Sequence, residues 1–438
     1  MSTPKKSKLK ENMFTLVLLT ISGAMIYALP YFRNYYYDVF VQCFNLTNTQ
    51  MGSLGSVFGA LSVVAYFFGG VLADRFSARK LITLSLTATG LLGFILLLYP
   101  PYPVVLAVHA LWGITSILTF WCALVKAIRS IADSDEQGKA FGFMEGGRGI
   151  TNIVHFSLIL AMFSYLSSNF SDKLGLSAII FVYSAVCVLL GIIVFFNLKE
   201  TDPELETATG QDTEEKKPLF NVPVLKKVLK MPHTWLVIIM MFTSYATLIG
   251  YYYIAPYTTS VFGASVVLAA AFTIFSQYCR PIGCFVAGIM GDKVGSSKVM
   301  LVGFAVMILG ILGIIFTPGK ASLVYVVVVF ACAIYTSMYA IQALHYAILE
   351  EGDYPTEFTG TAVAIIAPLG YSSEVFVPIV AGYLLDHFSG ALGYQLFFGI
   401  LATLGCIGLI ATIIWLSITK EKRKMIYESK KLKAKEAV

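Results

Sequence analysis

Six ionisable side chains lie inside long apolar stretches of the sequence: Arg33, Lys126, Glu145, Arg148, Arg280 and Glu374. A charge at the middle of a membrane helix costs about 2.5–3.5 kcal/mol on insertion scales, so each side chain needs a partner or a function. An arginine can present a planar fork to a carboxylate or a phosphate, and a lysine adds a point charge. Because four of the six are cations, a cavity shared by their helices would carry excess positive charge and would select anions.

Each of these residues also has a structural explanation. Arg33 could extend to the outer membrane interface among nearby tyrosines, and Lys126 could extend to the inner interface. Glu145 and Arg148 are three residues apart and could form a salt bridge along one helix. The remaining arginine and glutamate could form a buried pair with each other.

The composition places the chain in a membrane. Of its 438 residues, 57% are hydrophobic and 13% are charged, and the mean hydropathy is +0.77, well outside the usual soluble range. The formal charge of +6 does not indicate nucleic-acid binding, because the cations lie in short loops and tails between apolar runs. The cysteines form no C-x-x-C pair, so we expect no disulfide framework, no metal site and no other cofactor.

Crossing the hydrocarbon takes about 20 apolar residues, and the sequence contains twelve such stretches. The predicted spans are roughly 13–38, 50–73, 80–99, 103–131, 139–166, 176–197, 233–257, 264–290, 298–317, 321–350, 357–386 and 392–418. The first run is too long for a secretory signal and has no small-residue cleavage site, so it is predicted to be a span.

The predicted fold is an all-α polytopic membrane protein built as two pseudo-symmetric six-helix bundles. Its predicted segments are an N-terminal tail (1–12), a first bundle (13–198), a linker (199–231), a second bundle (232–419) and a basic tail (420–438). Lysine and arginine concentrate in the tails, the linker and alternate loops. The positive-inside rule therefore places both termini in the cytoplasm, with the chain in the plasma or inner membrane.

A charged loop recurs once in each half of the sequence. The first copy is Gly70–Lys80, the second is Gly288–Lys298, and their aspartates are 218 residues apart (292 − 74 = 218). We call these segments the first and second charged loops. Their recurrence between apolar runs indicates an internal duplication.

The first span of each half contains a proline with similar neighbours. Tyr27-Ala-Leu-Pro30-Tyr31 corresponds to Tyr253-Ile-Ala-Pro256-Tyr257. Helices interrupted at corresponding positions of two repeats indicate the binding site of a transporter. The alternative is two ordinary kinks with aromatic flanks that match by chance.

Six plus six spans, a long linker and G-x-x-x-D-[RK]-x-x-x-[RK] in both charged loops resemble the major facilitator superfamily over essentially the whole chain. The resemblance implies secondary transport by alternating access. It also implies a gating role for the first residue pair, Asp74 and Arg75, and for the second, Asp292 and Lys293. The alternative is that these solvated turns only fix topology. Ser77 replaces a glycine that is usual in the family, and we expect it to loosen the first loop.

The prediction of an anionic substrate is supported by a closer resemblance, in which single residues match those of anion transporter families. Arg33, followed by Asn34, resembles the first-helix arginine of organophosphate–phosphate antiporters, and Lys126 resembles the fourth-helix arginine of symporters for sugar acids. Arg280 is similar to the eighth-helix arginine of oxalate antiporters. The chain departs from these families, because Tyr251–Tyr253 replace a seventh-helix arginine and Glu374 replaces an eleventh-helix lysine.

The sequence thus predicts a monomeric secondary transporter for a small organic anion, driven by proton symport or anion exchange. The predicted substrate-binding residues are Arg33, Tyr27, Tyr31, Lys126, Arg148, Arg280, Tyr253 and Tyr257. Glu374 and Glu145 are the candidates for proton coupling, because a carboxylate near an arginine can exchange its proton as the anion binds and leaves. A lipid or drug exporter and a non-transporting membrane sensor are the alternatives, whereas no catalytic constellation indicates an enzyme.

Overall fold

The computed structural model describes residues 7–133, 136–199, 222–352, 354, 356–426 and 428, and these residues form helices, turns and loops without a strand. Eleven helices are long and apolar enough to cross a membrane. The pair α2 (Met13–Met25) and α3 (Ala28–Tyr35), bent by 45°, adds a twelfth span. The predicted all-helical polytopic fold is therefore confirmed. Most of the predicted linker and the end of the basic tail lie outside the described residues.

The chain divides into two units. The N-terminal unit comprises Met1–Glu215 and Val266–Ile274, and the C-terminal unit comprises Lys216–Ser265 and Phe275–Val438. This division differs from the predicted bundles at one place, because the first nine residues of α15 (Val266–Ser276) group with the N-terminal unit.

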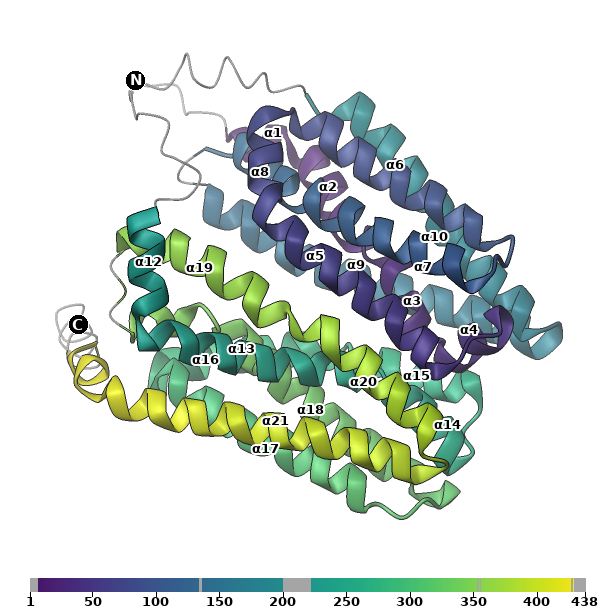
Figure 1. The fold of residues 1–438 in the computed structure, drawn as a ribbon. Helices are drawn as coiled ribbons and strands as arrows, with labels where there is room; N and C mark the ends of the chain where they lie inside the picture. The colour runs from purple at the N-terminus through teal and green to yellow at the C-terminus, as the bar shows by residue number, and fades with distance from the viewer. Residues whose placement is uncertain are drawn as a thin grey trace. The chain divides into compact units, whose positions relative to one another are not determined.

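The helices of the N-terminal unit follow one another with short connections (Figure 1). After α2 and α3 they are α4 (Tyr37–Phe44), α5 (Asn48–Arg75), α6 (Ala78–Leu96), α7 (Tyr102–Gly113), the π-helix η1 (Ile114–Leu118), α8 (Trp121–Ser130), α9 (Gln137–Asn169) and α10 (Asp172–Asn197), and a short α1 (Lys8–Glu11) precedes them. The main packing pairs are α6 with α10, α5 with α7, and α2 with α9.

The C-terminal unit begins with the amphipathic α12 (Val222–Lys230). Its other helices are α13 (Pro232–Tyr251), α14 (Ile254–Phe262), α16 (Cys279–Val294), α17 (Ser296–Phe316), η2 (Ala321–Leu323), α18 (Val324–Leu344), η3 (Ala347–Glu350), α19 (Thr356–Tyr371), α20 (Ser373–His387) and α21 (Ala391–Ile418). Helix α17 packs on α18 and α21, α16 on α18, and α13 on α21.

The first span of each half is broken at the same place. Two residues separate α2 from α3, two residues separate α13 from α14, and the third residue of each following helix is a proline, Pro30 or Pro256. A proline ring clashes with the carbonyl four residues earlier and offers no N–H to it. Those carbonyls belong to Ile26 and Tyr252, which lie in the two breaks. The predicted interruption at corresponding positions is confirmed.

Helices α16 and α18 approach each other closely at Gly283. A Cβ atom at this position would lie 2.4 Å from the backbone oxygen of Thr336, a distance at which one helix must shift. Gly288 lies on the same helix, and a Cβ atom there has no described atom within 4 Å. The two glycines therefore differ in packing while sharing one helix.

We expect Gly283→Ala to destabilise the C-terminal unit by about 1–3 kcal/mol, because overpacking displaces the α18 backbone. Gly288→Ala is the matched control and should leave the melting temperature of the purified protein unchanged or slightly raised, since alanine favours helix. Thermal unfolding in detergent measures both. Equal melting temperatures for the two variants would contradict the close approach.

Candidate functional site

Tyr27 and Tyr31 mark an accessible face at the break in the first span. Both are half-buried, whereas the residues between and immediately after them, 28–30 and 32–37, are buried. The two rings meet edge to face at 6.4 Å between centroids, and Tyr31 also meets Phe58 of α5 at 5.3 Å. The hydroxyl of Tyr27 donates to the Ser116 backbone oxygen at 3.5 Å. The role of these tyrosines in lining a substrate site stays a prediction.

Arg33 follows this break on α3 and is only 5% exposed. Its Nη1 donates to Asn34 Oδ1 at 3.0 Å and contacts Met51 Sδ, in the first turn of α5, at 3.8 Å. These two contacts orient the guanidinium from α3 and from the start of α5. The substrate-binding role of Arg33 stays a prediction.

Lys126 lies far from Arg33. Its Nζ donates to the Ala73 backbone oxygen at 3.0 Å, in the last turn of α5, whereas Arg33 contacts Met51 at the other end of that helix. The two α5 positions are 22 residues apart (73 − 51 = 22), which is about 33 Å at 1.5 Å per residue. One small anion cannot reach both cations in this conformation.

Arg148 is also engaged by the protein itself. It forms a salt bridge with Glu145 at 3.0 Å, lies over the Trp121 ring at 4.9 Å, and donates from Nε to the Gly23 backbone oxygen at 3.0 Å. The i,i+3 pairing considered above is therefore present. Gly23 lies in the last turn of α2, where helix carbonyls lose their intrahelical partners. Arg148 and Lys126 thus both satisfy carbonyls at helix C-termini.

In the C-terminal unit, one cation and one carboxylate belong to a cluster of tyrosines. The Arg280 guanidinium lies 4.8 Å from the Tyr339 ring centroid and interacts electrostatically with Tyr371. Tyr245 packs on Tyr371 with 4.7 Å between centroids, and its hydroxyl donates to Glu374 Oε2 at 3.1 Å. We call these five residues the arginine–tyrosine cluster. It joins helices α13, α16, α18, α19 and α20.

Two tyrosines predicted to line the site are packed into the C-terminal unit instead. Tyr253 is 5% exposed and donates to the Pro378 backbone oxygen at 3.0 Å. Tyr257 is 1% exposed and packs against Tyr394 and Phe398. The accessible face of this span carries other residues, and the lining role of Tyr253 and Tyr257 stays a prediction.

The residues that sequence reasoning missed are Tyr245, Tyr339 and Tyr371. On the seventh span, Tyr245 and Tyr252 are half-buried between buried neighbours, and they are seven positions apart, which places them on one helix face. That spacing was a usable signal. The contacts of Tyr339 and Tyr371 had no comparable signal, because they depend on packing between separate helices.

The four predicted gating residues lie in the charged loops. The side chain of Asp74 is outside the described part, and Arg75, Asp292 and Lys293 lie at the loops themselves, where Arg75 and Lys293 are exposed. Their gating role stays a prediction. Ser77, however, does not loosen the first loop: it is the N-cap of α6, with φ −66°, and its Oγ accepts from the Lys80 N–H at 3.3 Å.

The second charged loop is held by a distant carboxylate. Gly295, with φ +100°, has no side chain to cap α17, and this positive φ favours glycine. Instead, Glu351 Oε1 accepts from the Ser297 N–H at 3.2 Å, and its Oε2 accepts from Trp415 Nε1 at 3.3 Å. Glu351 is 7% exposed. A single carboxylate therefore joins the start of α17, the loop between α18 and α19 (which connects the tenth and eleventh spans and is called the 10–11 loop) and α21.

Another carboxylate holds the N-terminal end of the described chain. Glu136 lies in the loop between α8 and α9. Its carboxylate accepts a hydrogen bond from Ser7 Oγ and a second one, of 3.0 Å, from the Leu9 N–H. The hydrogen bond from Ser7, more than any other contact, lowers the pKa of the Glu136 carboxyl.

Among the described residues, no group of three or more histidine, cysteine, aspartate or glutamate side chains could hold a metal ion.

Comparison with known proteins identifies the family. Residues 13–373 match the Major Facilitator Superfamily. The chain belongs to this superfamily. It is 31% identical to the inner membrane protein YihN of Escherichia coli K12 over 423 residues, which cover 95% of this chain and 98% of that protein.

Two more distant similarities agree with this membership. The crystal structure of the nucleoside transporter NupG superimposes with a TM-score of 0.69 at 14% identity, covering 92% of this chain and 98% of NupG. The probable nitrate/nitrite antiporter NarK1 of Thermus thermophilus is 23% identical over 282 residues, covering 61% of this chain and 58% of that protein. The protein is thus an integral multi-pass membrane protein of a transporter superfamily.

The hydrogen bond from Lys126 to the Ala73 carbonyl leads to a prediction that distinguishes a structural role of this lysine from a substrate-binding role. Lys126→Met keeps the aliphatic stem and removes the ammonium, so the Ala73 carbonyl loses its donor. We expect a stability loss of about 1–3 kcal/mol and an unchanged affinity for any transported anion. Melting curves and equilibrium binding on the same preparation measure the two effects. A large loss of affinity without loss of stability would return Lys126 to the substrate site.

Proposed function

We propose that this member of the Major Facilitator Superfamily is a secondary active transporter that moves a small organic anion by alternating access. The observation that carries the proposal is Arg33, a buried arginine placed directly after a broken helix and oriented by the neutral side chains of Asn34 and Met51. Intramembrane arginines mark substrate or ion pathways, and interrupted helices at corresponding positions of two repeats mark transporter binding sites.

The C-terminal unit supports the same substrate class. Arg280 lies over Tyr339 in the arginine–tyrosine cluster, and an arginine can bind a carboxylate or a phosphate through its planar fork. A relative whose name specifies nitrate and nitrite supports an anion in general terms only. We propose Arg33, Arg280, Tyr27 and Tyr31 as substrate-binding residues. We leave Lys126, Arg148, Tyr253 and Tyr257 out of this proposal, because the first two donate to helix carbonyls and the other two are packed in the C-terminal unit.

Uptake into proteoliposomes tests this proposal, with sugar phosphates, sugar acids and dicarboxylates as the panel. For the anion that is transported, Arg33→Lys and Arg280→Lys should each weaken binding by about tenfold or more, because lysine keeps the charge but loses the planar fork. Lys126→Met is the matched control and should bind as the parent does. Transport of an apolar drug or a lipid that persists in both arginine variants would favour an exporter, whereas anion binding without movement would favour a sensor.

Glu374 makes a separate prediction about energy coupling. Its carboxylate is 7% exposed and accepts a hydrogen bond from Tyr245 within the arginine–tyrosine cluster. If this carboxylate carries the proton, Glu374→Gln should abolish accumulation driven by a pH gradient and preserve exchange of labelled for unlabelled anion across the membrane. Glu145→Gln is the control, because that carboxylate is exposed and paired with Arg148. Gradient-driven accumulation that survives Glu374→Gln would assign the residue a structural role.

A further inference from the structure

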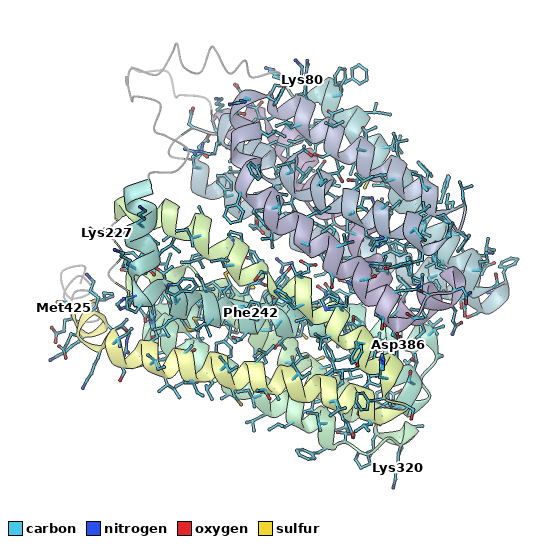
Figure 2. All side chains as sticks on the ribbon, viewed as in Figure 1. Lys80, Lys227, Phe242, Lys320, Asp386 and Met425 are labelled. Atoms are coloured by element: carbon cyan, nitrogen blue, oxygen red, sulfur yellow. The ribbon has the colours of Figure 1, made fainter. Side chains whose placement is uncertain are left out.

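A pocket of about 420 Å³ lies at the end of the C-terminal unit where α17 begins and α21 ends. Figure 2 shows Met425 and Lys227 at this end of the unit, with Lys320 and Asp386 at the other end. Three segments line it: the second charged loop, the 10–11 loop, and the last residues after α21. Its volume lies in the range of pockets that hold small molecules.

Cations outnumber carboxylates in the lining of this pocket. The cations are Lys293, Lys298, Lys420, Arg423 and Lys424, and the carboxylates are Asp292, Glu350 and Glu351. Glu351 is already committed to the backbone of Ser297 and the indole of Trp415. Within the part of the chain that the structure describes, no ion pair joins these cations to the pocket carboxylates. The positive charge is therefore not cancelled inside the pocket.

Two further features orient positive charge toward this space. Ser296 begins the 21-residue helix α17 and lines the pocket. A helix N-terminus attracts anions through its N–H groups and its dipole, and here Glu351 already accepts from one of these N–H groups, that of Ser297. Arg423 is held in place because its Nε donates to Thr419 Oγ1 at 3.1 Å and its Nη2 donates to the Leu416 backbone oxygen. A fixed guanidinium loses less side-chain entropy when it binds an anion.

We propose that this pocket binds a phosphate group, carried by a lipid headgroup or by a soluble phosphate compound. A phosphate monoester carries nearly two negative charges and three strong acceptor oxygens, so it can meet several of these donors at once. The phosphodiester of a lipid headgroup carries one negative charge and two non-bridging acceptor oxygens, and it would meet fewer of them. The bound group would join the second charged loop to the end of α21. The pocket contains none of the residues proposed to bind substrate, so this inference is independent of the proposed function.

Binding of labelled inorganic phosphate to the purified full chain tests the proposal. The pocket variant carries Lys298→Gln, Lys420→Gln and Lys424→Gln. The control variant carries Lys226→Gln, Lys227→Gln and Lys230→Gln on α12, which removes the same charge from the same end of the unit without touching the pocket lining. We expect about a tenfold or greater loss of affinity in the pocket variant alone. Any phosphate bound at a transport site adds equally to the binding measured for the two variants, so the difference between them reports on the pocket alone.

If the triple variant fails to fold, a single substitution that removes a negative charge from the pocket still tests the proposal. Glu350 is exposed, lines the pocket and forms no ion pair with any described residue, so Glu350→Gln removes a like charge from the phosphate site and should raise the affinity. Equal losses in the two triple variants would show diffuse surface attraction and overturn the proposal. An unchanged or lowered affinity in Glu350→Gln would also overturn it.

Vesicles distinguish the two sources of the phosphate. The parent is placed in phosphatidylcholine with or without phosphatidylglycerol, and inorganic phosphate binding is measured in each. Displacement of phosphate by phosphatidylglycerol, lost in the pocket variant, identifies a lipid headgroup, whereas equal binding in the two vesicles identifies a soluble compound. Absence of phosphate binding in both vesicles, together with no retention of phosphatidylglycerol by the purified chain, rejects the site.

Discussion

Hydrocarbon offers no hydrogen-bond partners, so every backbone group within a membrane span must be satisfied by the protein itself. This constraint makes the described chain helical and gives a particular meaning to each place where a helix ends or breaks. Lys126 donates to the last turn of α5, and Arg148 donates to the last turn of α2. Two of the four intramembrane cations named at the outset thus serve the backbone. Their charge also suits the negative end of the helix dipole.

Arg33 and Arg280 contact other side chains instead. Arg33 contacts an amide and a thioether, and Arg280 lies over an aromatic ring. A guanidinium bound to a helix carbonyl is part of the scaffold, whereas a guanidinium among side chains is placed where a ligand-binding arginine is expected. Each half of the duplicated chain has one arginine of the second kind. In the C-terminal unit tyrosines surround that arginine, and Tyr245 connects the cluster to Glu374.

Features that follow from composition and local chemistry could be predicted from the sequence. The apolar stretches predicted the spans, and Pro30 and Pro256 predicted two broken helices at corresponding positions. Features that depend on helix rotation and on long-range contacts could not be predicted in this way. Matching the residues around the two prolines suggested Tyr253 as a lining residue, but its ring faces α21 and contacts Phe397. The partner of Lys126 is likewise a backbone atom 53 residues earlier.

The two charged loops also differ in when they can be completed during synthesis. Ser77 and Lys80 close the first loop with a bond that spans three residues, so it can form as soon as that turn leaves the ribosome. The second loop depends on Glu351, which in turn bonds Trp415. Its cap can form only after the chain has been translated past Glu351. The two duplicated loops are therefore completed at different times, and a nascent chain arrested before Glu351 would hold a capped first loop and an uncapped second loop.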